Sequence, residues 1–134
     1  WWWSLIVLAV AGITTVLGHA IGARYEKDNG LVNAIVLPHV LRFNADAAAA
    51  GLAKVASALG LAQADVATQL PLIIETVSAI FKGLGVPSQL RELGVPREDL
   101  AELAQLAMGD WFLRGNPRPV REASELQQIM EAAW

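Results

Sequence analysis

The chain has 134 residues, 54% of them hydrophobic and 17% charged, which is enough for one domain with a substantial hydrophobic core. The net charge is −3, cysteine is absent, and no dense run of Lys or Arg is present. These properties exclude an intrinsically disordered chain, a disulfide scaffold and a thiolate metal site, and they give no reason to expect a nucleic-acid partner.

The first eighteen residues carry no charged side chain and begin with three consecutive tryptophans. We expect residues 1–20 to form an apolar helix that is buried on all sides. The alternative is a small membrane-anchored protein, since the stretch approaches the ~20 apolar residues that a membrane span needs. No Lys or Arg flanks the start, which counts against a span. The tryptophans can also mark a contact surface for a homo-oligomer or a partner protein.

Residues 22–30 are polar and bounded by glycines, so a loop is predicted there. Residues 31–134 are predicted to hold the remaining helices. The first of these contains Pro38, which should kink it, and Asn44 and Asp46 are expected to end it and cap the next one. Apolar residues at helical spacing predict the others over residues 46–59, 65–84, 88–93 and 120–133, with one more starting at Pro96 and a loop over 109–119. No alternation with a period of two appears, so the predicted fold class is all-α in a single domain over residues 1–134.

One stretch has a spacing specific enough to compare with a family. Its frame consists of Gly12, Thr15, His19, Gly22, Asn29-Gly30, Asn33-Ala34, Leu37-Pro38, Val40 and Asn44. This frame resembles the metal-site segment of the iron-containing alcohol dehydrogenases, especially the maleylacetate reductase-like branch. The later segments LGVPSQLRELGVP and GNPRPV resemble the C-terminal signature of the same family.

The resemblance covers about residues 12–133 and implies the all-helical domain of a two-domain enzyme. In that family a nucleotide-binding domain precedes the helical domain. This chain contains no Gly-rich phosphate loop after a strand, so we expect the nucleotide-binding domain to be absent from it. The chain starts with Trp1 rather than Met, which we interpret as a processed, trimmed or incomplete product.

The family reaction is the reversible NAD(P)-dependent oxidation of an alcohol, in which Fe(II) or Zn(II) polarises the substrate oxygen. By resemblance, Thr15 and Asn29 correspond to two metal-ligating histidines of the family. A Thr hydroxyl and an Asn amide are weak neutral ligands. The remaining ligands, an Asp and a His, lie upstream of this segment in the family. His19 corresponds to a family histidine near substrate and cofactor, and it is the one catalytic candidate. We therefore expect neither a metal nor a cofactor on this chain.

Other residues of the sequence are candidates for the same chemistry. His39, Glu26 and Asp28 offer an alternative metal site together with His19, although nothing in their spacing sets a ligand geometry. A histidine in a helix more often packs or forms a hydrogen bond. Arg24 and Tyr25 are expected in a solvated loop, with a position facing the substrate as the alternative. Arg118 is expected in a turn before the last helix.

Three functional hypotheses follow from these observations. The first is a metal-free, non-catalytic relative of the family domain that acts as a structural or interaction module. The second is half of an NAD(P)-dependent alcohol dehydrogenase that a separate nucleotide-binding domain completes. The third is the membrane-anchored helical protein described above. Whether the chain is an enzyme stays open, and the expected location is cytoplasmic, with membrane association as the alternative.

Overall fold

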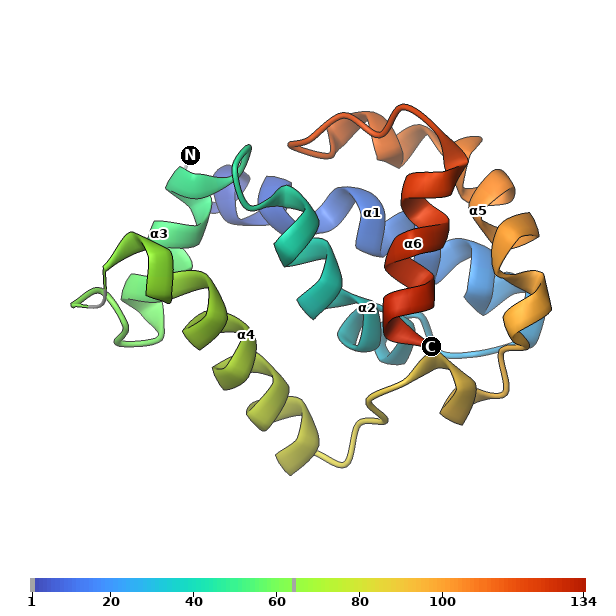
Figure 1. Ribbon diagram of the computed structural model, residues 1–134, viewed down its shortest axis with the longest axis horizontal. Helices are drawn as coiled ribbons and strands as arrows, with labels where there is room; N and C mark the ends of the chain where they lie inside the picture. The colour runs from blue at the N-terminus through green and yellow to red at the C-terminus, as the bar shows by residue number, and fades with distance from the viewer. Residues whose placement is uncertain (1, 64) are drawn as a thin grey trace.

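The computed structural model of the chain describes the backbone of residues 2–63 and 65–134, and the side chains of residues 12–63, 65 and 68–134. Within these residues every regular element is a helix, which confirms the predicted all-α class (Figure 1). The α-helices are α1 (Trp2–Tyr25), α2 (Asn29–Asn44), α3 (Ala49–Ala58), α4 (Val66–Gly83), α5 (Leu100–Met108) and α6 (Ala123–Ala133). Short 3₁₀ helices are η1 (Leu90–Leu93), η2 (Arg97–Asp99) and η3 (Trp111–Gly115).

Helices α1 and α2 pack against each other as the central hairpin of the molecule. Small residues on α1 allow this close approach, because a Cβ on Gly18 would collide with the side-chain amide of Asn33 and a Cβ on Gly22 with Asn29 Oδ1. With its amide nitrogen as donor, the Asn33 side chain bridges the two helices by donating to the carbonyl oxygens of Thr14 at 2.7 Å and Asn29 at 3.1 Å. Gly18 and Gly22 therefore mark the contact between α1 and α2, and of these two Gly22 belongs to the family frame.

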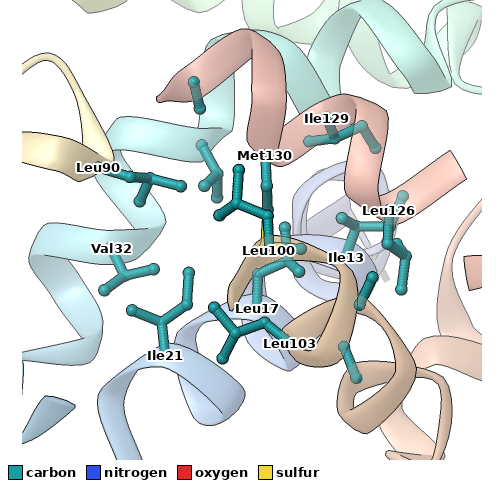
Figure 2. Close-up of a cluster of buried hydrophobic side chains, with 14 of the residues drawn as sticks. Ile13, Leu17, Ile21, Val32, Leu90, Leu100, Leu103, Leu126, Ile129 and Met130 are labelled. Carbon is teal, nitrogen blue, oxygen red and sulfur yellow. The ribbon is translucent and has the colours of Figure 1, made fainter. Parts of the chain in front are cut away.

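The main hydrophobic core lies between α1, α2, α5 and α6, with η1 at its edge (Figure 2). Its largest fully buried side chains include Ile13, Leu17, Ile21, Leu90, Leu100, Leu103, Leu126 and Met130. The part of α1 with described side chains thus supplies four fully buried residues, Ile13, Val16, Leu17 and Ile21. From Gly12 onward α1 buries one face in the core, whereas its residues His19, Ala23 and Arg24 are exposed, so the expected burial on all sides is wrong for this part of the helix. The expectation for the side chains of Trp1–Trp3 lies outside the described residues.

A second, smaller cluster joins α3 and α4 to the outer side of α2. Leu41 of α2, Leu52 and Ala56 of α3, and Ile73 and Ile74 of α4 form its buried centre. This pair of helices lies at the opposite side of the molecule from α5 and α6 (Figure 1). In the part of the chain that the structure describes, no helix meets the length and hydropathy that crossing a membrane requires.

The loop predicted over residues 22–30 is wrong in extent, and so is the first helix predicted over 1–20. Helix α1 continues to Tyr25 and α2 begins at Asn29, which leaves only residues 26–28 between them. The last turn of α1 persists because the Tyr25 hydroxyl donates to Asp99 Oδ2 at 2.5 Å. At the other side of the connection Asp28 caps α2, and its Oδ1 accepts from the backbone N–H groups of Gly30 at 2.7 Å and Leu31 at 3.2 Å.

The expected capping of the next helix by Asn44 and Asp46 is also wrong. Helix α3 starts at Ala49 without a side-chain cap, whereas Asn44 is buried and bonded to Asn116, 72 residues further along. The two amides exchange hydrogen bonds of 3.1 and 2.7 Å, and Asn116 Oδ1 also accepts from the backbone N–H of Ile13 at 3.3 Å. The segment before α6 is thereby joined to α1 and to the end of α2.

Candidate functional site

The candidate site is built around His19, which α1 presents at the surface, with 45% of its side chain exposed. Its Nδ1 lies 2.7 Å from Oδ2 of Asp110, 91 residues away in sequence and 19% exposed. Asp110 stands at the start of η3, and its Oδ1 accepts from the backbone N–H of Phe112 at 3.0 Å. One carboxylate therefore fixes both the start of η3 and one nitrogen of the histidine ring.

Aromatic side chains of η3 complete this arrangement. The Phe112 ring meets the His19 ring edge to face, with 5.7 Å between centroids and 73° between the planes. Trp111 lies against Phe112 at 4.0 Å between centroids. Both aromatic residues remain exposed, so the histidine ring sits at the border between apolar surface and solvent.

A groove of about 540 Å³ runs along α1 and α5 beside His19. Its walls are mostly small or apolar, and Asp110 and Arg24 are the charged residues that line it. Arg24 is held by two acids, with nitrogen–oxygen distances of 2.8 Å to Glu102 and 3.5 Å to Asp99. The groove therefore offers an apolar surface with one imidazole and charged groups that are already paired.

The charge state of Asp110 follows from its hydrogen bonds. The bond with His19, and after it the bond from the Phe112 backbone, hold the pKa of the Asp110 carboxyl below its ordinary value. Asp110 is therefore ionised at neutral pH, and its carboxylate only accepts hydrogen bonds. A carboxylate on one ring nitrogen of a histidine fixes the other nitrogen as the one that faces a ligand.

The sequence expectation for Arg24 and Tyr25, a solvated loop, is wrong. Both lie in the last turn of α1 and contact the start of α5 through Asp99 and Glu102. Burial, and then the hydrogen bond to Asp99, raise the pKa of Tyr25 to about 12. These residues therefore fix one end of the groove rather than project from a mobile connection.

Thr15 and Asn29, which the sequence resemblance assigns to two ligand positions, lie on different helices, α1 and α2. Thr15 is half-buried on α1, one turn before His19, and Asn29 is the exposed first residue of α2. The Asn29 side chain lies against Gly22. A hydroxyl and an amide are neutral oxygen ligands, which bind Fe(II) or Zn(II) weakly beside imidazole and carboxylate. These two residues do not fit the family's iron site.

The alternative metal site from His19, His39, Glu26 and Asp28 is not formed. Among the described residues no group of three or more His, Asp or Glu side chains is placed to hold a metal ion. Asp28 is occupied as the cap of α2. His39 lies in a different groove, between α2 and α4, and burial together with the charge of Arg42 lowers its pKa.

Arg118 has a structural role, as expected from its turn. Its guanidinium carbon lies 4.0 Å from the centroid of the Phe43 ring, and its nitrogens reach the Phe43 carbonyl at 3.3 Å and Glu125 at 3.4 Å. The residue that the sequence did not reveal is Asp110. Nothing near it in sequence points to His19, because the contact depends on the packing of η3 against α1.

Comparison with known proteins identifies the family of the chain. Residues 6–134 match the family model described as the C-terminal part of the Fe-containing alcohol dehydrogenase family. Lactaldehyde reductase of Escherichia coli (strain K12) is 33% identical over 125 residues, which cover 92% of this chain and 32% of that protein. Maleylacetate reductase of Sphingobium indicum is 29% identical over 133 residues, covering 98% of this chain and 35% of that protein.

A solved structure of a 1,3-propanediol oxidoreductase has the same fold over this region. The TM-score is 0.79 at 27% sequence identity, and the match covers 92% of this chain and 32% of the solved one. The chain thus spans about a third of the length of the relatives it matches. The helical arrangement, the residues that build it and the family match agree, and this chain belongs to the iron-containing alcohol dehydrogenase family, of which it represents the C-terminal helical domain.

Proposed function

We propose that this chain is a metal-free helical domain of its family and acts as a structural and interaction module. The proposal is supported by Thr15 and Asn29, which the resemblance of the frame places at the two family ligand positions that fall within the chain. The family's iron acts as a Lewis acid on the substrate oxygen, and that role needs ligands that hold the ion. Without two imidazoles, metal-assisted oxidation of an alcohol is not supported.

The interaction part of the proposal is supported by apolar surface. Trp111 and Leu106 are 68% and 56% exposed, and the Phe112 ring lies against that of Trp111. Exposed apolar residues that gather on one face are typical of contact surfaces. The apolar head of the chain, Trp1–Trp3, offers a second candidate surface, and deleting it should change the association state measured by light scattering. An unchanged monomer would count against a role for this segment.

The metal-free part is tested by replacing the last third of E. coli lactaldehyde reductase with this chain. The replacement supplies the upstream sequence that the chain does not span. We expect far less than one equivalent of Fe(II) or Zn(II) per chimera after incubation and desalting, measured by elemental analysis. The matched control is the double variant Thr15→His and Asn29→His, which should regain metal. One tightly held equivalent in the unmodified chimera would refute the proposal.

A second candidate function is favoured by the His19–Asp110 pair in its apolar groove. In this alternative the chain supplies the substrate side of an NAD(P)-dependent dehydrogenase or reductase, and another domain binds the nucleotide. Two relatives are named as an NAD-dependent methanol dehydrogenase and an NADPH-dependent butanol dehydrogenase. Retention of the histidine is the supporting observation, because a metal-free site still needs a group that exchanges the hydroxyl proton.

The same chimera separates the two candidates. The second candidate predicts carbonyl reduction by NADH or NADPH in the presence of a chelator, and loss of that activity in His19→Ala. The first candidate predicts no activity with or without chelator, together with normal folding by circular dichroism. A chelator-sensitive activity would contradict both, since it would require a bound metal.

A further inference from the structure

We propose that Asp110 is a positioning residue for His19: it holds the imidazole as the Nδ1–H tautomer, so that Nε2 of this groove-lining ring carries no proton. The catalytic consequence of this inference rests on the second candidate function. The tautomer of His19 does not rest on that candidate function, because the structure of this chain alone determines it. Asp110 lies far in sequence from the frame of residues 12–44.

Both oxygens of the Asp110 carboxylate have a hydrogen-bond partner. Oδ1 of Asp110 already accepts from the Phe112 backbone N–H at 3.0 Å, and Oδ2 lies 2.7 Å from Nδ1 of His19. A short contact between an ionised carboxylate and a ring nitrogen needs a hydrogen on that nitrogen, since the carboxylate has none to give. The neutral imidazole carries one ring proton, so its Nε2 keeps a free lone pair.

The surroundings of His19 hold its ring in place and do not compete for its free nitrogen. The Phe112 ring lies against the His19 ring edge to face, which limits rotation of the imidazole. Arg24 is the other charged residue that lines the groove, and its guanidinium is engaged with Glu102 and Asp99. Within the described part of the chain, no hydrogen-bond partner is found for Nε2. The acceptor nitrogen therefore stays available to a ligand.

The catalytic role of His19 follows from the free lone pair on its Nε2. When an alcohol is oxidised, its carbon loses a hydride to the nicotinamide and its hydroxyl loses a proton. An unprotonated Nε2 accepts that proton, the C–O bond becomes a double bond, and the resulting imidazolium is stabilised by the Asp110 carboxylate. The reverse reaction returns the proton from Nε2 to the carbonyl oxygen. With the other tautomer, Nε2 would carry a hydrogen and could not act as the base.

The tautomer is measured on the chain by long-range ¹H–¹⁵N NMR of labelled histidine. The chain has two histidines, so His39 serves as an internal reference in the same spectrum. We expect neutral His19 as the Nδ1–H form in the wild type, and a shift toward the Nε2–H form in Asp110→Asn. The Asn oxygen can still accept from Phe112, so η3 should persist. The control is Asp65→Asn at the cap of α4, which should leave His19 unchanged.

Two outcomes overturn the inference: a wild-type His19 in the Nε2–H form, or the same tautomer in the wild type and in Asp110→Asn. An active chimera adds a second readout, because Asp110→Asn should lower kcat by about 10²-fold or more while KM changes little. An unchanged kcat in an active chimera would also overturn it. If the tautomer shifts as expected and the chimera is inactive, the second candidate function fails while the positioning of His19 by Asp110 stands.

Discussion

At the residue scale, Gly12, Asn44 and Asn116 show how widely separated positions of the family pattern meet. Gly12 of α1 faces Asn116, and a Cβ on Gly12 would lie 2.5 Å from the Asn116 Cβ and 2.7 Å from its Cα. Asn116 in turn exchanges hydrogen bonds with Asn44. The glycine is therefore required by close approach of backbone and side chain, and the two amides satisfy each other in the protein interior.

This close approach predicts the effect of adding one methyl group. We expect Gly12→Ala to lower the free energy of unfolding by about 1–3 kcal/mol, because the crowding atoms include backbone that cannot move alone. Gly83→Ala is the matched control, since a Cβ there meets nothing within 4 Å at the end of α4. It should be neutral or stabilise the chain by roughly 0.4–1 kcal/mol. Urea unfolding of both variants checks the contrast, and equal effects would contradict it.

Tyr25 gives a pH prediction at the same scale. Its pKa is raised to about 12, because burial and the bond to Asp99 favour the neutral hydroxyl. A raised pKa in the folded state means that this contribution to stability is fully present below the ordinary tyrosine pKa of about 10 and is lost as pH rises toward 12. The chain has a single tyrosine, so an ultraviolet absorbance titration reports it directly.

The Asp99→Asn variant isolates the role of the carboxylate in that titration. We expect the tyrosine midpoint to move down toward the ordinary value, since the charge that opposes ionisation is removed. Glu98→Gln is the control, because Glu98 is an exposed neighbour of Asp99, whereas the tyrosine hydroxyl donates to Asp99. A wild-type midpoint near the ordinary value would contradict the buried hydrogen bond.

At the element scale, the sequence predicted the helices well and their connections poorly. Helical spacing of apolar residues located α2, α4 and α6 to within a few residues, because each helix buries one face. The loop over residues 22–30 was wrong because glycine was interpreted as a breaker, whereas Gly22 lies inside α1 and makes room for Asn29. Local composition does not show which glycines serve packing. Local composition also did not reveal Asp110, because its partner His19 is distant in sequence.

Capping provides the prediction at this scale. Asp28 caps α2 through two backbone N–H groups, whereas Asp46, which the sequence also suggested as a cap, is exposed and precedes a helix without a side-chain cap. We expect Asp28→Ala to lower the free energy of unfolding by about 1 kcal/mol. Asp46→Ala should change it by no more than about 0.5 kcal/mol. Thermal and urea unfolding measure both, and a larger effect at Asp46 would reverse the assignment of the cap.

At the scale of the whole molecule, the fold divides into two hydrophobic clusters of unequal size. The main cluster unites α1, α2, α5 and α6, and its position behind His19 and Asp110 holds the groove in shape. The smaller cluster attaches α3 and α4 to α2, and α4 leaves Ile80 and Leu84 exposed near its end. Stability should therefore be distributed unevenly, because regions with fewer buried apolar contacts open at lower free energy.

This asymmetry predicts that α3 and α4 open while the rest of the chain stays folded. Native-state hydrogen exchange should show lower protection for amides of α3 and α4 than for those of α1, α2, α5 and α6. Ile73 is fully buried in the smaller cluster. The Ile73→Ala variant should therefore lower the free energy of opening, mainly for amides of α3 and α4, by about 2–5 kcal/mol or until their protection is lost. Leu103→Ala in the main cluster should instead weaken every helix. If Ile73→Ala lowers protection in α5 and α6 as strongly as in α4, the two clusters unfold as one unit, and the groove beside His19 is not independent of the outer helices.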